Sequence, residues 1–109
     1  MKLAIAIVHE RDKQLVADSL LKAGHKFTII ASTGGFLKDG KTTFLIGAYE
    51  NKIDDIVQVL RKCCGVHEEY VNQPAPDVMG AAGVAINPVK VIAGGAIIFI
   101  VDVEDFIRV

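Results

Sequence analysis

The sequence has no tryptophan, few aromatic residues and only two cysteines, and each shortage disfavours a class of function. Aromatic residues make up 6% of the chain, which leaves few rings for stacking against the bases of a nucleic acid. The two cysteines, Cys63 and Cys64, are adjacent, whereas a disulfide framework needs cysteines that are spaced apart. We therefore interpret both as buried apolar residues and expect a cytoplasmic protein.

An excess of positive charge and a long apolar run are also missing. The formal net charge of −1 argues against a nucleic-acid-binding protein that relies on bulk positive charge. No apolar run reaches the roughly 18 residues that a membrane span requires. The apolar run from Leu3 to Val8 is too short for a signal-peptide core and is followed by charged residues, so we interpret it as a strand.

What the sequence does have is apolar content, which amounts to 51% of its 109 residues. This length favours a single domain over residues 1–109. A small chain with surplus apolar surface often buries that surface against copies of itself, so we expect an oligomer.

The apolar periodicity predicts an α+β fold in the order strand, helix, strand, strand, helix, strand. This is the ferredoxin-like βαββαβ plan, an antiparallel sheet with both helices on one face. Residues 66–88 have no clean period and are expected to be irregular, and the final residues 102–109 are expected to add a short edge strand. The predicted strands are 3–8, 26–33, 42–49 and 89–101, the last bent at Gly94-Gly95, and the predicted helices run from 10 to Gly24 and from an Asn51 N-cap to Gly65.

The stretch GFLKDGKT, residues 35–42, matches the phosphate-binding pattern G-x-x-x-x-G-K-[ST]. That pattern works only where a helix follows and its N-terminus faces the phosphates. Here TFLIGAY follows, with the alternating branched and aromatic residues of a strand. We therefore predict a turn between antiparallel strands near residues 38–40, and no nucleotide triphosphatase.

The same loop has other chemical uses. Gly34 and Gly35 carry no side chains, so their backbone N–H groups can approach an anion closely. Phe36 either packs into the core or offers a stacking surface. Lys26 and Lys41 are either solvated turn residues or a local attraction for phosphates.

The motifs ASTGGFLKDGKTTFLIG (31–47), KFT before it and VIAGGAIIFIVDVEDF (91–106) resemble the PII-like cyclic di-AMP receptors. The resemblance covers nearly the whole chain. It implies a homotrimer of ferredoxin-like subunits that acts in bacterial signal transduction without enzymatic activity. It also implies one cyclic di-AMP in each cleft between subunits, no other cofactor, and an unidentified downstream protein whose binding depends on reordered loops.

The resemblance also implies a set of ligand-binding residues. Thr28 would bond a phosphate or a base edge, the Phe36 ring would lie against an adenine, and Gly47 would leave room for the second base. The set comprises Lys26, Thr28, Gly34, Gly35, Phe36, Leu37, Lys41 and Gly47, with Phe99 supplied by the neighbouring subunit.

At three positions the sequence departs from the family pattern. The family commonly has asparagine at the positions of Gly24 and Lys41, and arginine at that of Lys26. Lysine keeps the positive charge, but it lacks the planar fork of arginine and the paired donor and acceptor of asparagine. The ligand is therefore cyclic di-AMP or, as the alternative, another ligand of the same trimeric plan, such as ATP, a different nucleotide or a metal ion.

Two further readings stay open from the residues alone. A small ferredoxin-like domain can host hydrolase or isomerase chemistry, but His9, His25 and His67 fit no metal or catalytic spacing and are expected at the surface or at strand ends. A purely structural trimer with an empty cleft is the other reading.

Overall fold

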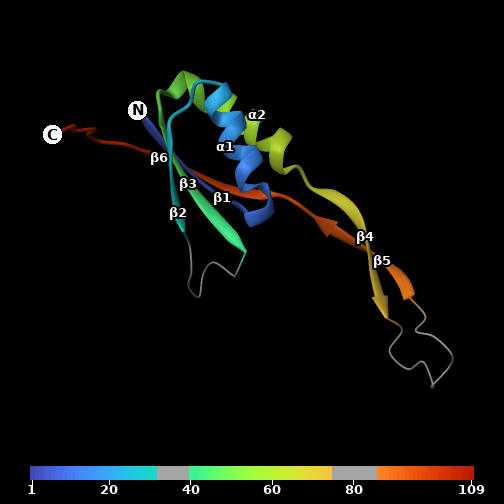
Figure 1. Cartoon of the computed structure of the whole chain (residues 1–109). Coiled ribbons are helices and arrows are strands. Elements are labelled where there is room, and N and C mark those ends of the chain that lie inside the picture. The colour runs from blue at the N-terminus through green and yellow to red at the C-terminus, as the bar shows by residue number, and fades with distance from the viewer. Residues whose placement is uncertain (32–39, 75–85) are drawn as a thin grey trace.

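The computed structural model describes residues 1–31, 40–74 and 86–109 (Figure 1). The molecule measures 67 × 27 × 19 Å, and its radius of gyration of 18.9 Å exceeds the roughly 13 Å of a compact chain of this length. The chain is therefore elongated. In chain order its elements are β1 (Lys2–His9), the 3-10 turn η1 (Glu10–Asp12), α1 (Lys13–Lys22), β2 (Phe27–Ala31), β3 (Lys41–Ala48), α2 (Glu50–Cys64), β4 (His67–Pro74), β5 (Ile86–Ala93) and β6 (Ala96–Asp102).

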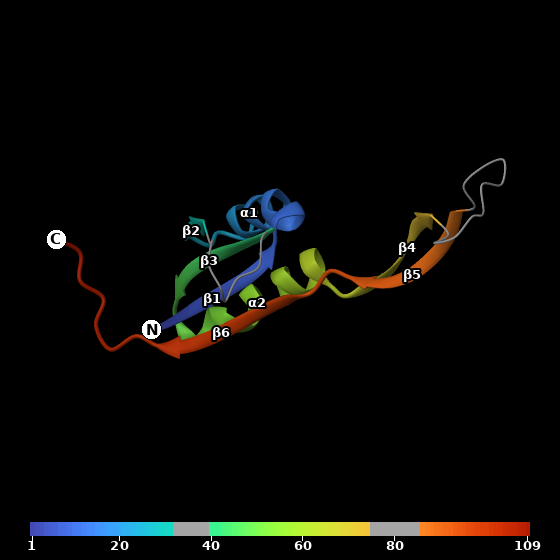
Figure 2. The same cartoon turned by 90° about the horizontal axis from the view of Figure 1, so that it is seen from below.

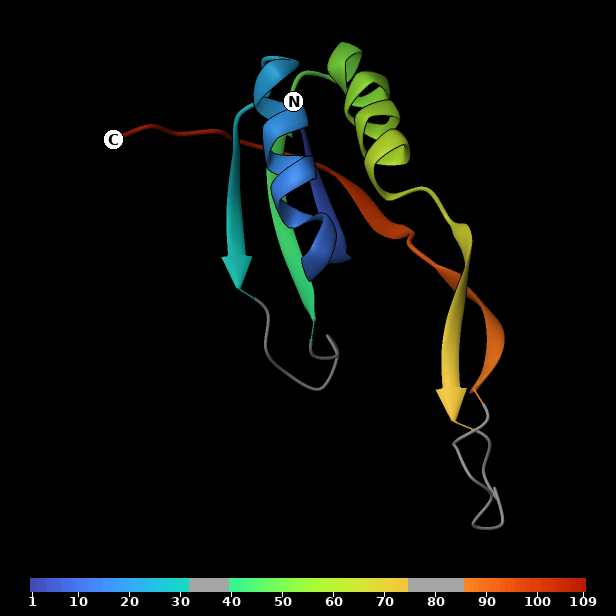
Figure 3. The same ribbon diagram turned by 45° about the vertical axis from the view of Figure 1, so that its right-hand side comes forward.

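Four strands form an antiparallel sheet in the order β2-β3-β1-β6. Both helices lie on one face of this sheet (Figures 1 and 3). The arrangement confirms the predicted α+β architecture, with β6 as the fourth strand of the sheet.

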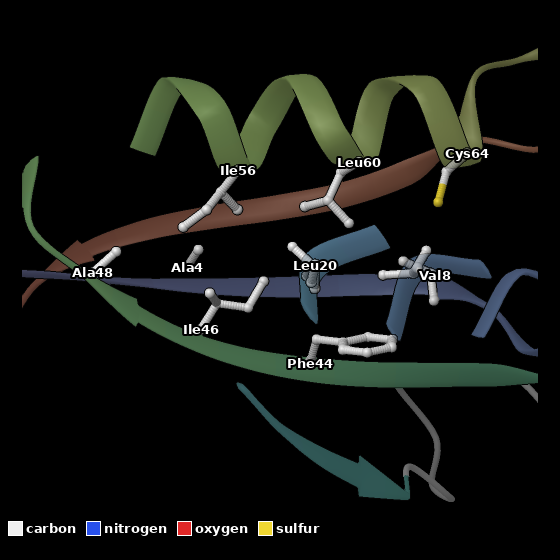
Figure 4. Packing of buried hydrophobic residues seen from close by; sticks show 11 residues of the cluster. Ala4, Val8, Leu20, Phe44, Ile46, Ala48, Ile56, Leu60 and Cys64 are labelled. Atoms are coloured by element: carbon white, nitrogen blue, oxygen red, sulfur yellow. The ribbon is translucent and has the colours of Figure 1, made fainter. Parts of the chain in front are cut away.

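The core fills the layer between the helices and the sheet (Figure 4). On β1, Ala4, Ala6 and Val8 are fully buried and alternate with half-buried neighbours, as a strand with one covered face requires. On α2, Ile56, Leu60 and Cys64 recur at helical spacing and point at the sheet. The rings of Phe27 and Phe44 meet with centroids 5.3 Å apart, and the remaining core residues are Val16, Leu20, Ile46 and Ala48.

The other face of the sheet, here called the open face, carries the opposite residues of each strand. Directly paired residues of antiparallel strands share a face, so the register assigns its members. Among its exposed members, Ile97 and Phe99 leave 58% and 54% of their surface uncovered. The apolar side chains of this face are Leu3, Ile5, Ile7, Ile30, Leu45, Ile97, Phe99 and Val101.

Gly24 supplies the left-handed residue that closes helix α1, which ends at Lys22. Gly24 has φ +86, its N–H donates to the Leu21 carbonyl at 3.0 Å, and the His25 N–H donates to the Leu20 carbonyl at 2.9 Å. This pair of bonds is the Schellman motif, in which a left-handed glycine closes the helix. Leu21, the neighbour of the buried Leu20, is 61% exposed.

Helix α2 begins at Glu50, and its N-cap lies two residues before the predicted cap. The N-cap position belongs to Tyr49, and no side chain caps the helix there, so the expected cap by Asn51 is wrong. The Glu50 carboxylate lies in the first turn, where it is favourably placed against the helix dipole.

A second sheet, the hairpin of β4 and β5, corrects the prediction of an irregular segment over 66–88 (Figures 1 and 2). Pro88 is tolerated because a two-stranded ribbon leaves outward-facing backbone groups without a ladder partner. The break at Gly94-Gly95 is confirmed: both glycines have positive φ, and they separate β5 from β6. Residues 103–109 form no strand, so the predicted edge strand at the end of the chain is wrong.

Candidate functional site

Lys41 is the first residue of strand β3, not of a helix. Gly40 before it has φ +87, and its carbonyl accepts a hydrogen bond of 2.7 Å from the Glu10 N–H. A phosphate-binding loop would need a helix N-terminus at this point. The matching letters of residues 35–42 therefore do not make such a loop, as the sequence analysis predicted.

The side chain of Lys41 is held at the end of strand β1. Lys41 pairs with His9 in the register, and its Nζ lies 3.1 Å from Nε2 and 3.2 Å from Nδ1 of that ring. Beside it, the Thr42 hydroxyl donates to the Glu10 carboxylate, and Lys13 Nζ lies 3.7 Å from the same carboxyl group. These side chains form a polar cluster at this end of the sheet, in which the ammonium group of Lys41 contacts the ring of His9.

Thr28 and Phe99 lie in one row on the open face but at opposite edges of the sheet. Thr28 pairs with Leu45, Leu45 with Ile5, and Ile5 with Phe99. With strands about 4.8 Å apart, three steps separate the two backbones by roughly 14 Å. One chain therefore cannot close both residues around the same small group.

Lys26 and Gly47 meet at a cavity of about 270 Å³ at one end of the sheet. Lys26 directly precedes Phe27, whose register partner Ile46 directly precedes Gly47. A Cβ on Gly47 would have only Met1 Cε near it, at 3.5 Å, so the position is open. The walls of the cavity also include Gly24, His25, Tyr49, Lys52 and Asp55.

His25 lies beside this cavity just before β2, at a strand end as expected, but it is buried there and not at the surface. It keeps 8% of its surface exposed, and its Nε2 lies 2.6 Å from Oδ2 of Asp55 on α2. The Schellman motif turns His25 inward, and the next residue, Lys26, is exposed. The contact fixes the start of β2 against the start of α2.

The site residues predicted from the sequence spread along β3. Lys41 and Gly47 are six residues apart, or about 20 Å along an extended strand, with Thr28 alongside the region between them. Lys26 and Gly47 are thus brought together, Lys41 lies at the other end, and Phe99 lies at the far edge. Gly34, Gly35, Phe36 and Leu37 fall outside the described residues.

The polar and aromatic residues of the cavity other than Lys26 were not predicted as site residues; they are His25, Asp55, Tyr49 and Lys52. His25 and Asp55 are 30 positions apart and meet only through helix packing, so no local spacing reveals them. Tyr49 had a signal, because it follows Gly47 by two residues and strand alternation puts both on one side.

The part of the chain that the structure describes contains neither a cluster of metal ligands nor a membrane-spanning helix. There, no three or more His, Cys, Asp and Glu side chains gather as metal ligands would. Over the same residues, neither helix is long and apolar enough to cross a membrane.

Comparisons with known proteins agree with this fold. A protein family described as cyclic-di-AMP receptor matches residues 1–109. A functionally unknown protein from Pediococcus pentosaceus, known from its crystal structure, is similar with a TM-score of 0.76 and 31% identity, over 99% of this chain and 96% of that one. The PII protein of Arabidopsis thaliana, crystallised with citrate, has a TM-score of 0.64 and 19% identity, over 99% and 79% of the two chains, and supports the fold alone.

Proposed function

Because the chain belongs to the cyclic-di-AMP receptor family and has a PII-like fold, we propose that it binds cyclic di-AMP as a signal-transduction receptor and catalyses no reaction. The family predicted from the sequence is thus confirmed. The single observation that carries the proposal is the family match along residues 1–109. The register and the cavity support the placement of the ligand.

The receptor is a homotrimer in this proposal, with the ligand in the cleft between subunits. The apolar open face supports it, since Ile97 and Phe99 are exposed on a face that no helix among the described residues covers. The positions of Thr28 and Phe99 on opposite edges support a cleft shared by two chains. One subunit would supply Lys26, Thr28 and the neighbouring loop, and the next would supply Phe99.

The binding chemistry is that of a doubly anionic ligand with two flat bases. Lys26 and Lys41 add charge-assisted hydrogen bonds to the phosphates, and the backbone of Gly34 and Gly35 adds further donors. Stacking on Phe36, with Leu37 beside it, contributes roughly 1–3 kcal/mol for each base. Ligand binding then reorders loops and so changes the surface offered to a downstream protein in the cytoplasm.

Isothermal titration calorimetry with cyclic di-AMP tests the proposal. We expect saturable binding with one ligand for each subunit, indifferent to magnesium. Gly47→Ala keeps the melting temperature, because a Cβ there meets only Met1 Cε at 3.5 Å, but it weakens binding about tenfold by filling the space of a base.

Two outcomes contradict this function. The absence of heat from the folded protein at high micromolar ligand removes cyclic di-AMP as the ligand. Magnesium-dependent binding of ATP in its place assigns the protein to the alternative, a sensor of another nucleotide on the same plan.

A further inference from the structure

Tyr49 directly follows strand β3 and lies on the same side of the chain as Gly47, two residues before it. Its φ of −70° and ψ of 154° are extended, so the alternation of the strand persists and both residues project to one side. Gly47 contributes no side chain, which leaves the space beside the Tyr49 ring unfilled. The ring is 72% exposed, although a tyrosine ring gains most when its apolar faces are covered.

Lys52 lies one helical turn beyond Tyr49 and lines the same cavity. The Lys52 N–H donates to the Tyr49 carbonyl at 2.9 Å, which fixes the two residues relative to each other. Lys26 lies on the wall formed by the start of β2. Within the described residues neither lysine has an ion-pair partner, whereas Asp55, the carboxylate of this cavity, is paired with His25.

The cavity therefore has the electrostatic character of an anion site in a chain of net charge −1. Two lysines, Lys26 and Lys52, line it, and its carboxylate is already in contact with an imidazole. Phosphate oxygens accept hydrogen bonds from ammonium groups, and such charge-assisted bonds are about twice as strong as neutral ones.

The size of the cavity decides how much of a ligand it takes. Pockets for a whole drug-sized molecule measure roughly 300–1,000 Å³. At about 270 Å³, this cavity is too small for a complete cyclic dinucleotide but suits one base with its phosphate.

We propose that Tyr49 and Lys52 belong to the ligand site. The base that Gly47 admits stacks on the Tyr49 ring, and its phosphate lies between Lys26 and Lys52. The inference rests on the proposed function and adds the two residues that recognise this half of the ligand.

Calorimetry on Lys52→Gln tests the charge. We expect cyclic di-AMP affinity to fall about tenfold, because one charge-assisted bond to phosphate is lost. The matched control is Lys62→Gln, the same change on the same helix but about 15 Å further along it, and it leaves the affinity within about twofold.

Two changes at Tyr49 test the stacking. Tyr49→Phe keeps the ring and is expected to bind like the wild type, whereas Tyr49→Ala loses the ring and binds about five- to tenfold more weakly. Because Tyr49 is largely exposed and caps no helix bond with its side chain, both variants should fold normally, which their melting temperatures check.

The outcomes separate this inference from the function on which it rests. If the wild type binds cyclic di-AMP and both Lys52→Gln and Tyr49→Ala bind equally well, the inference is wrong and the proposed function stands. If the wild type itself does not bind, both are overturned.

Discussion

Cys63 and Cys64 are neighbours in sequence but differ in their surroundings. Cys64 follows Ile56 and Leu60 at helical spacing and is 3% exposed, and burial raises the pKa of its thiol to about 11. Cys63 is half-buried on the adjacent side of α2, and its Sγ lies 3.9 Å from the Leu15 carbonyl oxygen. The sequence predicted both cysteines as buried. Their positions on helix α2 distinguish them, because Cys64 faces the core and Cys63 lies at its border.

The raised pKa of Cys64 makes stability depend on pH in the alkaline range. Between about pH 9 and 11 the unfolded thiol loses its proton while the folded one keeps it, so the unfolded state is favoured as pH rises. We expect the free energy of unfolding to fall by up to about 1.4 kcal/mol for each pH unit from this group.

Urea unfolding of the wild type and of Cys64→Ala at pH 8 and pH 10 measures this dependence. The variant is less stable at both values, because a buried side chain is shortened, but it loses less stability between them. Cys63→Ala is the matched control and keeps the wild-type dependence. A smaller pH dependence in Cys63→Ala than in Cys64→Ala would contradict the assignment.

At the scale of elements, the close of α1 determines where β2 starts and how His25 and Lys26 point. The motif depends on Gly24, whose φ of +86 is a conformation that only glycine, and to a lesser degree asparagine, adopts easily. The sequence predicted this helix end correctly from a local signal. It could not predict that the same turn buries His25 against Asp55, since that contact joins the turn after α1 to helix α2, 30 positions further along the chain.

Gly24→Ala should destabilise the protein by about 1–2 kcal/mol, because alanine is strained at this φ although no atom lies within 4 Å of its Cβ. Gly24→Asn should cost less, as asparagine tolerates the left-handed region. Thermal or urea unfolding of both variants measures the difference. Equal losses of stability in Gly24→Ala and Gly24→Asn would contradict the explanation by backbone conformation.

Most strands were predicted within one or two residues, because alternation and branched side chains mark them directly. The hairpin of β4 and β5 was missed because Pro74 and Pro88 are typical of irregular segments. Pairing in a two-stranded ribbon tolerates proline where a central strand does not. The predicted N-cap of α2 was displaced by two residues because asparagine is a better capping residue than tyrosine, although Tyr49 holds the position.

At the scale of the whole molecule, the two edges of the sheet carry predicted ligand-binding residues that lie far apart in one chain. The register, which no local pattern shows, places Thr28 and Phe99 in one row but three strands apart. From the sequence, these two residues could be predicted as ligand-binding residues only because the chain resembles a known family. Their separation is the physical reason to expect that a complete site needs two chains.

Subunit mixing tests that expectation. Thr28→Ala and Phe99→Ala should each weaken binding as pure proteins of trimer mass, three times 11.7 kDa, while both keep the fold because the two side chains are exposed. After the two variants are unfolded together and refolded, about a quarter of the clefts should contain an intact Thr28 from one chain and an intact Phe99 from the next.

Calorimetry of the mixture then recovers part of the wild-type binding. A mixture of each variant with itself, treated in the same way, is the control and recovers none. If the mixed sample also fails to bind cyclic di-AMP, or if the proteins sediment as monomers, the proposal of a cleft shared by two chains is wrong.

The hairpin of β4 and β5 projects away from the four-stranded sheet (Figure 3). Where β5 leads into β6, the Gly95 N–H bonds the Cys64 carbonyl, and Gly94 and Gly95 both have positive φ. The eight-residue strands of the hairpin make a lever arm of about 27 Å beyond this pivot. A rotation of about 10° at the glycines would sweep the far end of the described strands through about 5 Å. An ångström-scale adjustment where the arm is anchored is thereby magnified several-fold at its tip.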